Sequence, residues 1–463
     1  MREKDRSVGN MQAIFRTEDA ATDPASTGVD PEDAPLNRFH WRLTFYSGGG
    51  PFLDGYILSI IGVAMVQATP ELGLSTSWQG LIGASALIGI FFGGCLGGWL
   101  TDKFGRQVLY TLDLILIIAC SVAQFWAQTA FTLFILRLLI GVAVGADYPI
   151  ATALLAEFVP RRYRGPLLGG LIAIWFAGAA VAYVVGELLL HFGPDGWRWM
   201  LASAALPATA FVIMRHGTPE SPRWLSRQGR HAEATMVIRQ VYGTNANSKP
   251  ISSSSDHERL DGWALFRSGY GDRLFFVTAF WTCSIVPLFA VYAFGPTILA
   301  SLGLDEAMAN FGSAFITALL LAGCLVAMAI VNRLGRRKLM LHSFLWSGIA
   351  LLLLSIATGS APIIVLSCFS AYALFIGGAQ VLTWVYPNEL FPTEIRGTAI
   401  GMASSLSRIG AAAGTYLAPI SLDTLGIGAT MSIAAFITFV GFVVSWRWAP
   451  ETTDFGLDQS ASL

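Results

Sequence analysis

Six charged side chains interrupt long apolar stretches of this chain, where ionisable groups are rare unless they are paired or have a function. They are Asp54, Asp113, Arg137, Asp147, Glu187 and Arg408. A carboxyl group in apolar surroundings changes its proton affinity when its solvation or a nearby cation changes. A guanidinium stays charged and binds a carboxylate through two parallel hydrogen bonds. These residue types therefore predict proton exchange and recognition of an anion.

The stretches that carry these charges are long enough to cross a lipid bilayer. Hydrophobic residues make up 54% of the 463 and charged residues only 13%, a balance typical of membrane proteins. Apolar stretches of about 20 residues, the length that spans a bilayer, begin near residues 43, 78, 108, 130, 166, 197, 273, 309, 339, 362, 398 and 429. We therefore predict an all-α membrane protein with 12 transmembrane helices, six in each half.

The distribution of Lys and Arg predicts how the chain crosses the membrane. Alternate connections, near 67–77, 191–196, 300–308, 359–361 and 422–428, contain neither residue, whereas the connections between them are basic. Positive charges accumulate on the cytoplasmic side, so we expect both termini there. The expected organisation is a flexible cytoplasmic tail (1–42), a six-helix bundle (43–214), a cytoplasmic loop (215–272), a second six-helix bundle (273–448) and a cytoplasmic tail (449–463).

Three motifs rich in charged residues occur twice at a nearly constant offset. Two Gly-Arg pairs lie 230 residues apart, two Glu-x-x-Pro-x-x-x-Arg-Gly motifs 232 apart and two Pro-Glu pairs 231 apart. Such a common spacing indicates a duplicated half. The motif residues are Gly98, Asp102, Gly105, Arg106, Glu157, Arg164, Glu220 and Arg223 in the first half, and Asn332, Gly335, Arg336, Glu389, Arg396 and Glu451 in the second.

Together these motifs resemble those of the major facilitator superfamily, in its sugar-porter-like, metabolite:proton symporter branch. The segments around Asp54, Asp147 and Glu389 closely resemble bacterial metabolite transporters of the YaaU type. The resemblance implies a secondary active transporter whose two halves rock around a central site. It implies that the motif residues form a cytoplasmic gate of ion pairs between the halves. The alternative is that these charges only anchor helix ends, and Asn332 in place of Asp102 makes the two halves unequal.

Asp54 is the first candidate for the proton site, with Arg137 as its partner and Asp147 as the second candidate. Proton-coupled sugar porters place the acid at the position of Ile57, one helical turn further on. Asp147 resembles the acid of the Gly-Asp-Tyr-Pro motif in phosphate:proton symporters. The alternative for either carboxylate is a permanent ion pair with Arg137, and it stays open for whichever one does not carry the proton. Asp113 and Glu187 are expected to be structural.

Arg408 predicts binding of an anionic substrate, and the alternative is a structural ion pair on a facing helix. Hexose porters carry Gln and Asn where this chain has Cys283-Ser284 and Pro287-Leu-Phe289, so the site is poor in sugar-binding groups. We expect a partly aromatic cavity, although aromatic residues at helical spacing are more often packing. The predicted substrate-binding residues are Arg408, Gln380, Trp384, Tyr56, Trp175 and Phe289.

The predicted function is proton-coupled uptake of a small organic metabolite, an organic or aromatic monocarboxylate, in a bacterial inner membrane. A sugar or polyol:proton symporter, a proton antiporter that exports a small molecule, and a non-transporting sensor are the alternatives. The sequence contains no nucleotide-binding, nucleophile or metal-binding motif, and its net charge is −1. We therefore expect no enzyme activity, no cofactor, no metal and no nucleic acid. The expected partners are substrate, protons and lipid, with the chain a monomer.

Overall fold

The computed structural model describes residues 35–104, 106–243, 270–357, 360–391 and 393–452. The regular structure in these ranges is α-helical, apart from one short 3-10 turn at Gln124–Trp126. The helices of the first half are α2 (Arg38–Ser47), α3 (Gly49–Glu71), α4 (Thr76–Phe104), α5 (Arg106–Ala123), α6 (Ala130–Phe158), α7 (Arg161–Leu190), α8 (Gly196–Ser203) and α9 (Ala205–Arg215).

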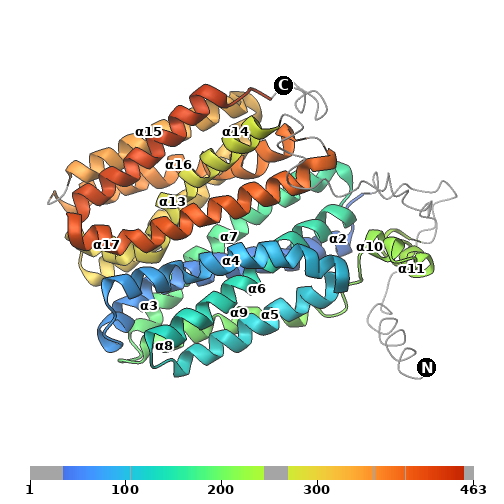
Figure 1. Ribbon diagram of the computed structural model, residues 1–463, viewed down its shortest axis with the longest axis horizontal. Helices are drawn as coiled ribbons and strands as arrows, with labels where there is room; N and C mark the ends of the chain where they lie inside the picture. The colour runs from blue at the N-terminus through green and yellow to red at the C-terminus, as the bar shows by residue number, and fades with distance from the viewer. Residues whose placement is uncertain (1–34, 105, 244–269, 358–359, 392, 453–463) are drawn as a thin grey trace.

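Two short helices, α10 (Pro222–Arg227) and α11 (His231–Tyr242), follow the first half. The helices of the second half are α13 (Gly271–Ser301), α14 (Glu306–Leu334), α15 (Arg336–Ile356), α16 (Pro362–Leu390) and α17 (Thr393–Trp448). In Figure 1 the first half, blue to green, and the second half, yellow to red, lie side by side. The helices α3, α4 and α7 contact α13, α17 and α14 respectively across the boundary.

The described residues include eleven helical segments long and apolar enough to span a membrane, and the last supplies two passes. This segment, 399–448, is 50 residues long. At Gly426 its backbone leaves the helical conformation (φ 78°, ψ 171°). The hydroxyls of Ser421 and Thr430 are 2.8 Å apart, whereas nine residues of straight helix would separate them by about 13 Å. The chain therefore reverses at Gly426, between the two spans predicted to begin near 398 and 429.

Helix α2 begins inside the region predicted to be a flexible tail. Asn37 caps it: the side-chain oxygen accepts from the His40 backbone N–H, and the Asn37 N–H donates to His40 Nδ1, each at 3.0 Å. The Asn37 amide also donates to the carbonyl of Val241 in α11 at 2.8 Å. The predicted boundary at residue 42 rested on the length of the apolar stretch, which does not register a capping box. The rest of that tail, residues 1–34, lies outside the described residues.

The connections between helices define two ends of the bundle. We call the end that carries Gly335, Glu389 and Glu451 the motif face, and the end that carries Glu71, Leu190 and Asp305 the opposite face. Near the opposite face the halves touch backbone to backbone. A Cβ on Gly62 of α3 would lie 2.7 Å from the carbonyl oxygen of Tyr292 in α13.

A second backbone contact between the halves, at Gly80, leads to a prediction about closure of the opposite face. A Cβ on Gly80 of α4 would overlap the carbonyl oxygen of Tyr416 in α17. Gly80→Val should therefore push the halves apart at an expected cost of about 1–3 kcal/mol. We expect faster maleimide labelling of a cysteine introduced at Thr415, which is fully buried.

Gly401→Val is the matched control, because a Cβ at Gly401 of α17 meets no atom within 4 Å. It should leave the labelling rate unchanged. Equal labelling rates in the two variants would contradict the close packing assigned to Gly80.

Candidate functional site

Asp54 is buried where α3 and α7 pack against each other. Its side chain is 1% exposed, and its Oδ2 accepts a hydrogen bond from Trp175 Nε1 at 2.6 Å. Glycines allow this approach: a Cβ on Gly55 would overlap the Trp175 carbonyl, and a Cβ on Gly178 would overlap that of Phe52. Backbone contact between α3 and α7 thus holds the Trp175 ring against the Asp54 carboxyl group.

Arg137 does not pair with the carboxylates that were expected to be its partners. It is 1% exposed on α6, and its guanidinium donates to the carbonyl oxygens of Ile82 (3.3 Å) and Ile57 (3.4 Å). Within the described residues it forms no ion pair with Asp54 or Asp147. Helix carbonyls therefore take the place of the predicted carboxylate, and Arg137 remains a buried cation beside α3.

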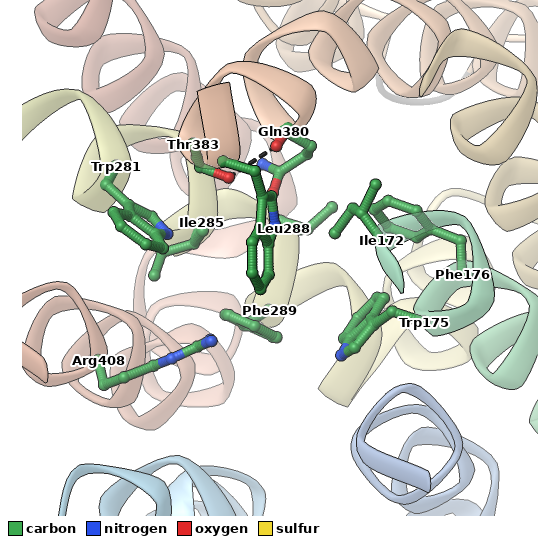
Figure 2. Close-up of a pocket in the computed structure, with 11 residues that line it drawn as sticks. Ile172, Trp175, Phe176, Trp281, Ile285, Leu288, Phe289, Gln380, Thr383 and Arg408 are labelled. Carbon is green, nitrogen blue, oxygen red and sulfur yellow. Dashed lines mark hydrogen bonds between the residues drawn. The ribbon is translucent and has the colours of Figure 1, made fainter. Parts of the chain in front are cut away.

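A pocket opens between the two halves, and five of the six predicted substrate-binding residues line it (Figure 2). The space not filled by atoms, including solvent on the open side, is about 380 Å³. The lining comes from α7, α13, α16 and α17: Ile172, Trp175, Phe176, Trp281, Ile285, Leu288, Phe289, Gln380, Thr383, Trp384 and Arg408. These positions lie on the motif-face side of the contacts at Tyr292 and Tyr416.

Arg408 is the charged side chain of this pocket. It is 9% exposed, and its guanidinium carbon lies 5.2 Å from the centre of the Phe289 ring. Its Nε is buried without a hydrogen-bond partner, and the described residues provide no carboxylate in ion-pair contact with it. The structural ion pair that was the alternative is therefore not formed. Because a buried N–H normally has an acceptor, the protein leaves this guanidinium incompletely satisfied.

The polar groups around Arg408 are few. Gln380 donates through Nε2 to the carbonyl of Ser284 at 3.3 Å, and the Thr383 hydroxyl donates to the carbonyl of Gln380 at 2.6 Å. Tyr56 lies elsewhere: its hydroxyl is 2.6 Å from that of Ser203. Nothing in the sequence marks Ile172, Phe176, Ile285 or Thr383 as residues that line a site. Apolar residues on a spanning helix carry no signal that separates a cavity wall from ordinary packing.

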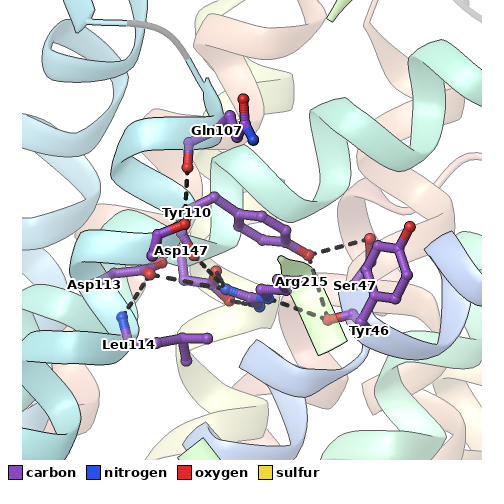
Figure 3. A network of polar contacts seen from close by, with 9 residues as sticks. Tyr46, Ser47, Gln107, Tyr110, Asp113, Leu114, Asp147 and Arg215 are labelled. Atoms are coloured by element: carbon purple, nitrogen blue, oxygen red, sulfur yellow. Dashed lines mark hydrogen bonds and ion pairs between the residues drawn. The ribbon is translucent and has the colours of Figure 1, made fainter. Parts of the chain in front are cut away.

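Asp147 belongs to a second buried cluster, in which its partner is Arg215 and not Arg137 (Figure 3). Arg215, at the end of α9, donates to both Asp147 oxygens, at 2.9 and 3.4 Å. Asp113 of α5 lies 3.8 Å from the same guanidinium, which also stacks 3.4 Å from the Tyr110 ring centre. All three charged side chains are at most 3% exposed. Arg215 was missed because it sits in the last turn before a loop and was counted as a cytoplasmic charge.

The repeated motifs make contacts within each half in the described residues. Arg336 pairs with Glu389 at 2.9 Å, and the carboxylate of Glu451 accepts from the backbone N–H groups of Arg336 (3.0 Å) and Arg337 (3.2 Å). Glu220 likewise accepts from the N–H of Gln107 at 3.1 Å. Each Pro-Glu motif thus places a carboxylate at a helix N-terminus, which favours negative charge.

This arrangement differs from the pairing between halves that was expected of the motifs. Asn332 is exposed, and a Cβ on Gly335 would lie 2.6 Å from Glu451 Oε2. The side chains of eight further motif positions lie outside the described residues: Gly98, Asp102, Gly105, Arg106, Glu157, Arg164, Arg223 and Arg396.

Known proteins resemble the chain over nearly its whole length. The family model described as "Sugar (and other) transporter" matches residues 24–462. The chain is 40% identical to the inner membrane metabolite transport protein YgcS of Escherichia coli K12, over 92% of this chain and 94% of that protein. It is 39% identical to the metabolite transport protein YaaU of the same strain, over 93% and 97%.

Solved structures show the same fold. The xylose transporter XylE of E. coli, in a partially occluded inward-open conformation, superposes with a TM-score of 0.79 at 21% identity, covering 91% of this chain and 100% of that one. The family match and the two relatives agree with the bundle of spanning helices. The chain is a multi-pass membrane transporter, not an enzyme, and it belongs to the sugar (and other) transporter family of the major facilitator superfamily.

Proposed function

We propose that this transporter couples the uptake of a small organic carboxylate to proton movement by alternating access. The observation that carries the proposal is the position of Trp175. Its ring lines the pocket with Arg408, while its N–H binds Asp54. One side chain thus touches both the substrate space and the first candidate proton site.

The proton affinity of Asp54 depends on the hydrogen bond from Trp175, because hydrogen bonding and desolvation both shift a carboxyl equilibrium. A ligand in the pocket contacts the Trp175 ring and changes that bond. Arg137 adds a buried positive charge beside α3, because its guanidinium donates to the carbonyl of Ile57 in that helix. Substrate binding and protonation of Asp54 are therefore linked in free energy, as coupled transport requires.

Arg408 supports an anionic substrate with an apolar or aromatic body. Its guanidinium side chain lines the pocket and provides charge-assisted donors. The Trp175, Trp281 and Trp384 rings provide flat apolar walls around it. A monocarboxylate matches this division, because one end is charged and the remainder is apolar.

Asp147 remains the second candidate for the proton carrier. It shares the Arg215 guanidinium with Asp113. A cluster of two carboxyl groups and one charged guanidinium is neutral only when one of the two carboxyl groups is protonated. A buried cluster with net charge is costly. Asp54 is preferred because its partner Trp175 also lines the pocket, whereas the described contacts of Asp147 do not reach it.

The motif face is assigned to the cytoplasm on the distribution of Lys and Arg. The contacts of Glu451 and Glu220 suggest that the motifs keep each half rigid, so that the halves rock as bodies. Gating pairs between the halves remain proposed for the motif residues. Because the pocket lies on the motif-face side of the backbone contacts at Gly62 and Gly80, we assign this structure to an inward-facing state.

A sugar:proton symporter is the second candidate, and the names of the relatives favour it. The D-xylose-proton symporter of E. coli K12 is 28% identical over 78% of this chain. The apolar pocket and Arg408 favour a carboxylate instead. Competition by sugars but not by carboxylates in an uptake assay would support the sugar alternative.

Asp54→Asn should abolish proton-driven accumulation and retain exchange. In proteoliposomes with a gradient of one pH unit, one proton per substrate supports about tenfold accumulation. Without a titrating carboxyl group the ratio should fall to about 1, while exchange of labelled for unlabelled substrate continues. Tenfold accumulation in Asp54→Asn would show that another group carries the proton, with Asp147 the next to be replaced.

Arg408→Gln should weaken carboxylate binding roughly 10- to 100-fold, the loss of one charge-assisted hydrogen bond. Arg408→Lys keeps the charge without the fork and should give an intermediate loss. Arg447→Gln, near the end of α17 where Arg447 lies 5.6 Å from the ring centre of Trp448, is the matched control. Binding of a carboxylate panel is measured by competition, and unchanged affinity in Arg408→Gln would remove the argument for an anion.

A further inference from the structure

A second buried carboxyl group joins the two halves near the opposite face. Glu187, close to the end of α7, is 9% exposed, and Asn310 in the second turn of α14 is 1% exposed. Asn310 Nδ2 donates to Glu187 Oε2 at 2.8 Å. Because α7 belongs to the first half and α14 to the second, this bond exists only while the halves are in contact here.

The amide of Asn310 is only half satisfied by this contact. Its Oδ1 is buried and has no hydrogen-bond partner. An ionised carboxylate accepts hydrogen bonds but donates none, so it cannot satisfy a carbonyl oxygen. A protonated Glu187 has an O–H to donate. Acid and amide are then joined by two hydrogen bonds, one in each direction.

The surroundings of Glu187 supply no cation to stabilise an ionised form. On its own helix, His191 Nδ1 contacts the Glu187 backbone oxygen at 3.0 Å and not the carboxyl group. Between Met308 and Asn332, α14 carries no charged residue. The other titratable groups at this end of the described residues include Tyr183 on α7, Tyr292 on α13, Asp195 before α8 and Asp305 before α14. Glu71 of α3 pairs with Arg198 of α8 at 2.7 Å, and Asp423 of α17 accepts from the Thr76 hydroxyl at 3.2 Å.

We propose that Glu187 and Asn310 form a proton-sensitive latch that holds the halves together at the opposite face. Protonation of Glu187 closes the latch with a second hydrogen bond. Ionisation leaves a buried carboxylate beside an unsatisfied amide oxygen, which favours separation. The inference rests on the proposed function in one respect, because alternating access requires this face to open.

The latch differs from the proton carrier in where its proton goes. Glu187 is sealed when the face is closed and meets the solution on this side when the face is open. Its proton therefore enters and leaves on one side. The latch sets how readily the face closes at a given pH, and it adds nothing to the number of protons transported.

Distance measurements on the full chain test the latch without substrate or gradient. Spin labels are placed on cysteines at Phe192 and Met308, one in each half at this face and both exposed, in a background where the five native cysteines are replaced by alanine. In lipid nanodiscs, pulsed dipolar spectroscopy then reports the closed and open populations at each pH. The parent should open as the pH rises.

Glu187→Gln should remain closed across the pH range, because its amide both accepts from Nδ2 and donates to Oδ1, as a protonated acid does. Asn310→Leu should lower the closed:open ratio at low pH about fivefold or more, the ratio that one hydrogen bond contributes. Asp195→Asn removes an exposed acid at the same face and should respond to pH like the parent.

The inference is overturned if Glu187→Gln opens with pH as the parent does, or if the parent shows no pH response. A transport arm separates it from the proposed function. Where uptake is proton-driven, Glu187→Gln should keep the parental proton:substrate ratio, and a reduced ratio would make Glu187 a carrier and refute the latch. Where no proton-driven uptake is found, the proposed function fails, and the distance measurements still decide the latch.

Discussion

The cost of burying charge in a lipid-embedded bundle organises this structure. An ionised group away from water must be paired, hydrogen-bonded or neutralised by a proton. Arg215 is paired with Asp147 and lies close to Asp113, and Arg137 is satisfied by helix carbonyls. Arg408 and Asn310 each retain a buried polar atom without a partner. The sites that we propose for substrate binding and for the latch are those where the protein leaves that requirement unmet.

Two kinds of close packing position these groups. Within the first half, glycines bring α3 against α7 and hold Trp175 on Asp54. Between the halves, Gly62 and Gly80 allow backbone contact near the opposite face. The first contact places Asp54, the proposed proton site, beside the pocket, whereas the second has to break and reform in the alternating access that we propose. Glycines thus allow a permanent contact within the first half and a separable contact between the two halves.

The sequence was sufficient for the spanning helices and for much of the pocket, but not for the partners of its charges. Apolar stretches and the repeat predicted the spans, and Arg408 was recognised because a guanidinium in a spanning helix is costly. For Asp147 only Arg137 was considered as a partner, whereas the cation that pairs with it, Arg215, comes from the end of a different helix. Asn310 could not be recognised from the sequence, because burying a neutral amide in a spanning helix costs less free energy than burying a charge.

The internal repeat explains why the framework was easier to predict than the site. Glu220 and Glu451 occupy equivalent positions and cap equivalent helices. A motif that is recognised in one half can therefore be checked against its copy in the other half. Asp54, Arg408 and Glu187 have no such counterparts: Ser284, Gly178 and Ala418 occupy the positions about 230 residues away. A rocking transporter needs symmetric halves to present one site to two sides, yet a site placed between them contacts each half once. Charged residues proposed to bind substrate or protons at that boundary therefore need no counterpart in the other half. Only the folded structure shows which groups of other helices contact them.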